Sequence, residues 1–259
     1  KKEFPRLICC SITGFGHDDP YAQRAGCDFI IQGMSGLMSV TGEPEGMPQK
    51  TGVAITDVFT GMYAANAVLA ALHMRGRTGQ GQHIDLALLD CAVAVTANQA
   101  MNYLAIGDAP QRLGNAHPNI VPYQVFACAD GHLIIAVGND GQFARLAAAL
   151  GLPQLAVDPD YATNPARLEN RDALVSLLTE AMAGIGKAEL LALCEDNGVP
   201  AGPINDLEEV FADPQVQARG LRIGLDGVPG VRPPFRFSGA EIALDRPSPK
   251  LGEDQDLLE

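Results

Sequence analysis

The amino-acid sequence predicts a mixed α/β protein with a well-filled core. The chain has 259 residues, enough for one large domain or two ordinary ones. Apolar residues make up 47% and charged residues 19%, which excludes a disordered chain and a coiled coil. The absence of Trp together with 28 Gly and 18 Pro favours a turn-rich α/β enzyme over a helical bundle.

The N-terminal part is expected to contain one strand and one short helix. Residues 7–13 (LICCSIT) form a continuous apolar run, which is typical of a buried strand. Residues 14–26 form a polar loop with Gly and Pro, and residues 27–42 predict a helix that ends near Gly36. Residues 43–52 are a turn-rich connector.

Two long, largely buried helices are expected next. Residues 56–75 repeat apolar side chains at helical spacing with small residues between them, which predicts a helix packed on nearly all sides. Thr56 or Asp57 is expected at its start. Residues 75–82 predict a loop, and residues 83–107 predict a short strand followed by the second buried helix.

The C-terminal half predicts paired strands and then amphipathic helices. After a loop-like stretch at 108–124, residues 123–138 predict two strands joined by the turn Asp130-Gly131. Three amphipathic helices are expected at 140–150, 170–183 and 187–197. A short helix at 206–212 and a β segment at 221–225 precede a Pro-rich tail.

Charge and composition exclude several classes of partner. Acidic residues outnumber basic ones, 31 to 18, for a formal net charge of −13, and no basic stripe interrupts this balance. Such a chain repels phosphate backbones, so we expect no nucleic-acid partner. No apolar run reaches the roughly 18 residues that cross a bilayer, so we expect no membrane partner. The six cysteines lack metal or disulfide spacing, which predicts no metal site and a reducing, cytoplasmic compartment.

Asp57 is the first candidate for chemistry. It follows the apolar stretch 52–55 and opens a nearly uncharged helix, where backbone N–H groups and the helix dipole hold a carboxylate ionised. An ordinary N-cap explains an Asp at a helix start equally simply. Asp90 lies in a similarly apolar helix and is expected to be a structural hydrogen-bonding residue.

The loop from Gly114 to Asn119 (GNAHPN) is the second candidate. Gly114 frees the backbone, Pro118 stiffens it, and the loop offers several polar groups to a ligand. A turn with an Asx hydrogen bond, or a His117 that only caps a helix, accounts for the same residues. The Gly-rich stretch 76–82 lacks P-loop spacing, and neither a G-x-S-x-G nor an H-E-x-x-H pattern occurs.

Eight ordered segments then resemble one known family. Four of them are RAGCDFIIQGMSGLMSVTGEPEGMPQKTGVAITDVFTGMYAANAVLAAL (24–72), RTGQGQHIDLALLD (77–90), GNAHPNIVPYQVF (114–126) and PKLGE (249–253). Together they resemble the class III CoA-transferases, the family of formyl-CoA and carnitine-CoA transferases. The resemblance runs the whole chain and is strongest to the succinyl-CoA:glutarate type.

The resemblance implies an architecture. It implies a large Rossmann-like domain whose N-terminal, CoA-binding segment is expected to be missing from this chain, and a smaller α+β domain. Residues 1–110 would belong to the large domain with the catalytic Asp, 111–200 would be the small domain, and 201–259 would return to the large domain. The family's subunits form interlocked homodimers, so a homodimer is expected.

The resemblance also assigns roles to residues. Asp57 falls on the catalytic nucleophile, which would form an aspartyl anhydride and then an aspartyl-CoA thioester. The substrates would be an acyl-CoA and a carboxylic acid, and no permanently bound cofactor or metal is expected. Related α-methylacyl-CoA racemases have a catalytic His where this chain has Cys27, so a racemase or epimerase is the alternative, with an inactive binding subunit as another. The remaining assignments are CoA contacts at Arg24, Ala25 and Cys27, and substrate or loop contacts at Gly114, Asn115, His117 and Asn139.

Overall fold

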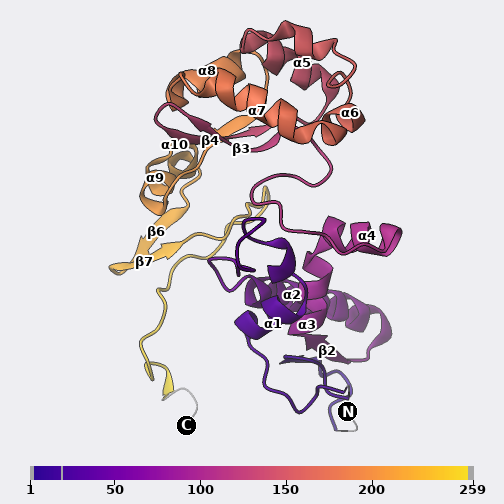
Figure 1. Ribbon diagram of the computed structural model, residues 1–259. Coiled ribbons are helices and arrows are strands. Elements are labelled where there is room, and N and C mark those ends of the chain that lie inside the picture. The colour runs from indigo at the N-terminus through magenta and orange to yellow at the C-terminus, as the bar shows by residue number, and fades with distance from the viewer. Residues whose placement is uncertain (1–2, 19, 256–259) are drawn as a thin grey trace.

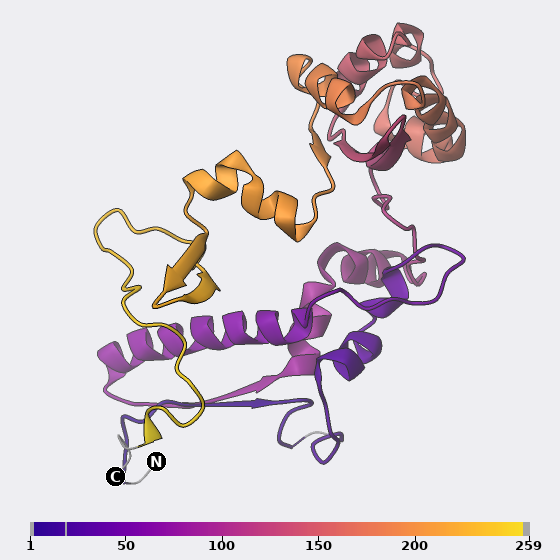
Figure 2. The same cartoon turned by 90° about the vertical axis from the view of Figure 1, so that its left-hand side faces the viewer.

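The computed structural model describes residues 3–18 and 20–255 and is a mixed α/β structure, as the composition predicts (Figure 1). The N-terminal half forms one lobe, and the segment from about 120 to 203 forms a second lobe above it in this view. After the second lobe, the chain forms short helices and a hairpin and then runs back alongside the first lobe (Figures 1 and 2).

A parallel strand pair organises the first lobe. Strand β1 (Cys9–Thr13) pairs with β2 (His83–Ala87) in register from Cys9 opposite His83 to Thr13 opposite Ala87. The connection between them holds α1 (Asp28–Met34), the 3₁₀ turn η1 (Met38–Val40) and α2 (Ile55–Thr78). Parallel strands need such a crossover. Figure 2 shows α2 lying along the strand pair.

Helix α2 is longer than predicted at both ends. Its N-cap is Ala54, so Thr56 and Asp57 lie inside the first turn and the prediction that one of them starts the helix is wrong. Its last residues, up to Thr78, occupy part of the predicted loop at 75–82. Gly79 ends the helix in a left-handed conformation, with φ of 74°, and its N–H bonds to the Arg75 carbonyl, an arrangement that glycine adopts without strain.

The prediction of deeply buried helices in this lobe is wrong. Only Thr56, Thr60 and Ala71 are buried in α2, because strands β1 and β2 and helices α1 and α3 (Leu88–Val95) cover a single side of it. Strand β1 is also partly exposed. Large apolar side chains are therefore exposed on α2 and on the helix at 97–106, including those of Val58, Met62, Leu69, Met101 and Leu104.

The second predicted helix is also broken in two. Helix α3 (Leu88–Val95) ends at Thr96, and α4 (Ala97–Ile106) begins at Ala97, whose φ is 44°. A β-carbon makes this backbone conformation uncommon, so the break is a local feature that periodicity could not reveal. No residue of α4 is buried.

By length and mean hydropathy, α2 qualifies as a helix able to cross a membrane. The prediction that no segment would qualify is wrong by this measure. Uninterrupted apolar runs in α2 are short, but its Ala, Val, Leu and Met residues and its scarcity of charged residues keep its mean hydropathy high.

The second lobe has its own sheet and core. Strands β3 (Tyr123–Cys128) and β4 (Gly131–Ala136) form the predicted hairpin, and β5 (Ala201–Pro203) adds to β4, all antiparallel. The three predicted helices are confirmed, and η2 and α6 were not anticipated. These elements are α5 (Asp140–Ala149), η2 (Pro153–Ala156), α6 (Asn164–Glu169), α7 (Arg171–Met182) and α8 (Lys187–Asp196). Fifteen buried residues from Val121 to Val199 form the core of this lobe.

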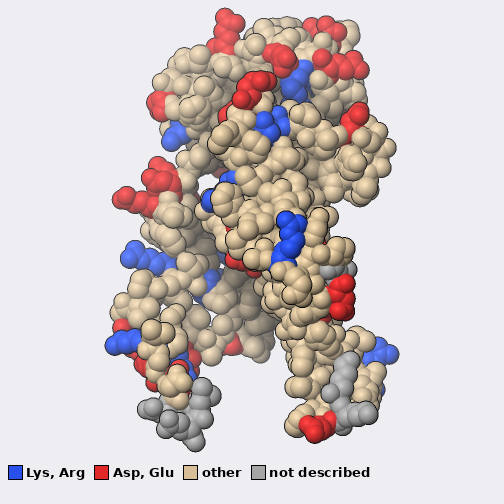
Figure 3. Space-filling view, turned by 60° about the horizontal axis from the view of Figure 1, so that its bottom comes forward, with Lys and Arg blue, Asp and Glu red and all other residues tan. Residues whose placement is uncertain are grey.

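The chain then forms two short helices and a hairpin. Helix α9 (Leu207–Ala212) confirms the predicted short helix, and α10 (Pro214–Ala218) follows it. Strand β6 (Arg222–Leu225) confirms the predicted β segment, and it pairs with β7 (Val228–Val231), which the Pro-rich composition concealed. On the face in Figure 3, blue Lys and Arg side chains are scattered singly rather than forming a stripe.

Candidate active site

The candidate site lies at the carboxyl edge of the parallel strands. Strand β1 runs into the loop at 14–27, which leads directly to the start of α1. Helix α2 connects to the amino end of β2 through a few residues, so its other end, which carries Asp57, lies toward the carboxyl edge. At this edge, the Leu89 N–H in the first turn of α3 bonds to the carbonyl of Gly14, which follows β1, at 3.1 Å. Ligands of open α/β sheets bind at this kind of edge.

Asp57 is an exposed carboxylate in the first turn of α2. Within the described part of the chain, it makes no side-chain hydrogen bond and no ion pair. The N-cap interpretation of Asp57 is therefore wrong, since Ala54 holds that position without a side-chain bond. The helix N-terminus favours a negative charge at this position, and the exposed carboxylate is open to an incoming reactant.

A partly buried network fixes the helix turn that carries Asp57. The Asp28 carboxylate, at the start of α1, accepts the Thr56 N–H at 2.9 Å and the Gln32 amide at 2.7 Å. Gln32 is fully buried, and its oxygen accepts the Thr51 N–H at 3.0 Å. Helix α1 thus holds the connector before α2 and the first turn of α2 together.

The loop at 114–119 is tied to that same connector. Gly114 has φ of 57°, and its N–H bonds to the Gly42 carbonyl at 3.1 Å. The Arg112 guanidinium donates to the carbonyls of Glu43, Pro44 and Gly46. Two segments that lie some seventy residues apart in sequence are therefore joined by four hydrogen bonds.

His117 is held from several sides. Its N–H bonds to the Tyr123 carbonyl, and its ring lies 5.1 Å from the Tyr123 ring. Its Nδ1 accepts the Asn119 N–H at 3.1 Å, so the ring of His117, and not an Asx side chain, makes the local turn. Arg171 donates to the His117 and Pro118 carbonyls. Burial, and then the Arg171 charge, lower the pKa of His117 below its ordinary 6.5, which favours a neutral imidazole at pH 7.

The residues predicted to contact CoA lie just before α1. The Arg24 guanidinium stacks over the Tyr21 ring at 4.4 Å, and Ala25 is exposed. Cys27 is the exposed N-cap of α1 and precedes Asp28. All three therefore lie on the segment that connects β1 to the Asp28 network.

Asn139 and Asn115 stand apart from this arrangement. Asn139 lies in the second lobe, where its side chain accepts the Gln142 N–H at 2.9 Å and caps α5. This structural bond accounts for Asn139 without a ligand. Asn115 is exposed on the loop next to Gly114. Within the residues that the structure describes, no group of three His, Cys, Asp or Glu side chains is placed to hold a metal ion.

Sequence reasoning missed four residues that shape this site: Asp28, Gln32, Arg112 and Arg171. Asp28 and Gln32 are one helical turn apart at the start of a helix, a spacing that permits a hydrogen bond. That signal was present in the sequence. The carbonyl contacts of Arg112 and Arg171 join distant segments, and no local pattern predicts them.

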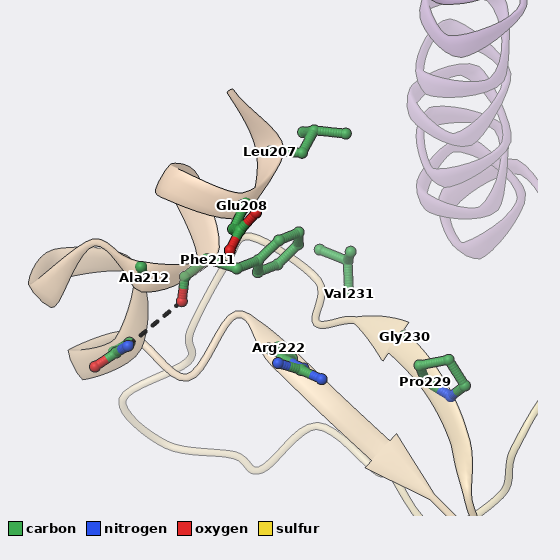
Figure 4. Close-up of a pocket in the computed structure, with 9 residues that line it drawn as sticks. Leu207, Glu208, Phe211, Ala212, Arg222, Pro229, Gly230 and Val231 are labelled. Carbon is green, nitrogen blue, oxygen red and sulfur yellow. Dashed lines mark hydrogen bonds between the residues drawn. The ribbon is translucent and has the colours of Figure 1, made fainter. Parts of the chain in front are cut away.

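A separate cavity of about 690 Å³ lies between α9 and the β6–β7 hairpin (Figure 4). Apolar side chains of Leu207, Phe211 and Val231 line it, with Glu208 and Arg222 adding one charge of each sign. None of the predicted site residues lines this cavity, so we do not assign the transfer chemistry to it.

Comparison with known proteins agrees with the resemblance. The chain is 57% identical over 256 residues to the succinate–glutarate CoA-transferase of Agrobacterium fabrum, covering 97% of this chain and 64% of that protein. It is 42% identical to the human succinyl-CoA:glutarate CoA-transferase, covering 96% and 58%. A crystal structure of a CAIB/BAIF family protein from Brucella suis superposes with a TM-score of 0.85 at 58% identity, covering 98% and 67%.

The chain spans about three fifths of the length of the curated relatives that it matches. The family model for CoA-transferase family III matches residues 1–255, almost the whole sequence. This chain belongs to CoA-transferase family III.

Proposed function

We propose that this chain provides the nucleophile of an enzyme that transfers CoA from a succinyl-CoA-like donor to a carboxylic or dicarboxylic acid. The observation that carries the proposal is the Asp57 carboxylate, exposed and without a side-chain partner among the described residues, at the N-terminus of α2. The names of the Agrobacterium and human relatives support succinate and glutarate as the acids. The family match supports the reaction class.

The chemistry follows from a carboxylate nucleophile. Asp57 attacks the thioester carbonyl of the donor and expels CoA thiolate, leaving a mixed anhydride. The thiolate then attacks the aspartyl carbonyl, which releases the donor acid and leaves an aspartyl-CoA thioester. The acceptor carboxylate attacks that thioester, and the returning thiolate cleaves the second anhydride to give the new acyl-CoA and free Asp57.

Each step exchanges one activated acyl group for another, so the proposed route needs no metal and no permanently bound cofactor. CoA enters as part of the substrate. The helix N-terminus stabilises the free carboxylate between steps. We further propose that Arg24, Ala25 and Cys27 contact CoA, and that Gly114, Asn115 and His117 serve the substrate or its loop. Asn139, whose side chain caps α5, is not included in this proposal.

We also propose an interlocked homodimer with a Rossmann-like large domain. The apolar side chains exposed on α2, such as Val58, Met62 and Leu69, support a further cover for this helix, and we propose that a second copy of the chain supplies it. In that arrangement residues 1–110 and 201–259 belong to the large domain, and 111–200 form the small one. A cytoplasmic location fits six cysteines that are all free.

Activity assays with the full chain test the function. Succinyl-CoA and glutarate should yield glutaryl-CoA, followed by chromatography of the CoA esters. Asp57→Asn should abolish transfer, and Asp57→Glu should lower it roughly 100-fold because one methylene displaces the attacking oxygen by about 1 Å. Asp90 was expected to be a structural hydrogen-bonding residue, but it is an exposed carboxylate in the first turn of α3 with no side-chain hydrogen bond among the described residues. Asp90→Asn is therefore the matched control and should retain activity.

Other outcomes identify the alternatives. Exchange of the α-proton of a methyl-branched acyl-CoA without new CoA esters would indicate a racemase, although Cys27 is a poor substitute for the catalytic His of racemases. CoA binding without either reaction would indicate an inactive binding subunit. Normal transfer by the Asp57→Asn variant would refute the proposal.

A further inference from the structure

Helix α2 begins without a cap of its own. Its N-cap is Ala54, which has no side chain able to accept a hydrogen bond. The first N–H groups of a helix have no partner inside the helix and usually bond to a side chain of the N-cap. Here the Thr56 N–H bonds to Asp28 Oδ1 at 2.9 Å, so the cap comes from a different helix, 28 residues away in sequence.

Both oxygens of Asp28 are used. While Oδ1 accepts the Thr56 N–H, Oδ2 accepts the Gln32 side-chain amide at 2.7 Å. Gln32 is 0% exposed, and its oxygen accepts the Thr51 N–H at 3.0 Å, with the Thr51 hydroxyl 3.3 Å away. The donors and acceptors along this path are therefore matched, and each side chain has one orientation that satisfies them.

Asp57 depends on this path for its position. It follows Thr56 directly, and no side-chain bond holds its own carboxylate within the described residues. The place of its attacking oxygen is consequently set by the backbone of the first turn. The side chains that hold this turn to α1 are Asp28 and Gln32.

We propose that Asp28 and Gln32 are positioning residues for Asp57: they hold the first turn of α2 so that the Asp57 carboxylate meets the thioester carbonyl. The inference rests on the proposed function of Asp57. Neither side chain touches the reacting atoms, and their effect passes through the Thr56 and Thr51 N–H groups. A misplacement of about 1 Å lowers a rate on the order of 100-fold.

The matched donors and acceptors suggest a swap experiment. In Asp28→Asn, an NH₂ group faces the NH₂ of Gln32, and turning Gln32 over would leave the Thr51 N–H facing a donor. In Gln32→Glu, two carboxylates face each other. In the double variant, the new amide at position 28 accepts the Thr56 N–H and donates to the new carboxylate at position 32. The other oxygen of that carboxylate accepts the Thr51 N–H, so every bond is restored.

The three variants are compared by kcat and KM in the full chain, with the folded fraction measured by circular dichroism. Each single variant should lose at least about tenfold in kcat while KM for acyl-CoA changes less than about threefold. The double variant should regain at least about tenfold over the worse single variant. Asp206→Ala removes a cap from α9, far along the chain, and should leave kcat unchanged, which separates positioning from general loss of stability.

Two results would overturn the inference. One is a folded single variant with the kcat of the parent, and the other is a folded double variant no faster than the worse single one. If a single variant does not fold, the double variant alone decides. Asp57→Asn is assayed in parallel: if it remains active, the proposed function fails, whereas an inactive Asp57→Asn with an unaffected Asp28→Asn refutes only the positioning role.

Discussion

Replacing Arg167 with Met is expected to destabilise the second lobe strongly. The Arg167 side chain is 1% exposed and makes three divergent hydrogen bonds. Its Nε donates to the Val121 carbonyl at 2.6 Å, Nη1 to the Tyr161 carbonyl at 2.9 Å and Nη2 to Asp140 Oδ1 at 2.8 Å. The guanidinium also lies 4.4 Å from the centre of the Phe143 ring. It therefore joins the chain entering this lobe to α5 and α6.

The two carbonyl bonds dominate the expected loss. Each is a hydrogen bond from a charged donor, worth about 1.5–3 kcal/mol, and Met leaves both carbonyls without that donor. The Asp140 side chain is 55% exposed, so the ion pair adds only about 0–1 kcal/mol. Met offsets part of the loss, because it removes a buried charge and can pack on Phe143. The two carbonyl bonds and the weak ion pair, less this offset, give an expected loss of about 3–5 kcal/mol in the free energy of unfolding.

The assay is urea denaturation of the full chain, with hydrogen exchange of β3 and β4 as a probe confined to the second lobe. For a chain of this size, the loss corresponds to a fall in Tm of roughly 10 °C. Asp140→Asn is the matched control, because it removes only the exposed partner, and it should cost less than about 1 kcal/mol. A loss below about 1 kcal/mol for Arg167→Met would refute the reasoning, because it would mean that Arg167 does not hold these carbonyls in solution.

Two further predictions concern the loop and the start of α2. An NMR titration should give His117 a pKa below 6.5, so that its contribution to stability is present above pH 6.5 and is lost as the pH falls through the lower folded-state pKa. Arg171→Met removes the nearby positive charge and should raise that pKa toward 6.5, and an unchanged or lower value would contradict the assigned cause. Thr56 Oγ1 is buried without a partner among the described residues, so Thr56→Val should be neutral or stabilise the fold by up to about 1 kcal/mol. A loss above about 2 kcal/mol on denaturation would show that this hydroxyl has a partner.

Local patterns in the sequence predicted most of the elements. The Asp130-Gly131 turn lies between two apolar runs, and β3 and β4 form the predicted hairpin there. The helices at 140–150, 170–183 and 187–197 have amphipathic spacing, and α5, α7 and α8 fall within a residue or so of those ranges. Such elements are set by short-range periodicity and turn chemistry.

Features that depend on neighbours were predicted poorly. The apolar residues of α2 suggested burial on all sides, but burial depends on what packs against a helix, and only one side of α2 is covered. The break at Ala97 depends on a single unusual φ. At the site, Asp57 was identified from its helix start and the family resemblance, whereas its connection to Asp28 required coordinates, because it joins two helices through a backbone N–H.

Trapping the covalent intermediate tests the central claim most directly. The full chain is incubated with succinyl-CoA, treated with hydroxylamine and digested for mass spectrometry. An aspartyl-CoA thioester reacts with hydroxylamine to give a hydroxamate, so the account predicts a modified Asp57 in the peptide that contains the start of α2, with Asp90 unmodified. A hydroxamate on another carboxylate, with Asp57 unmodified during turnover, would contradict the account.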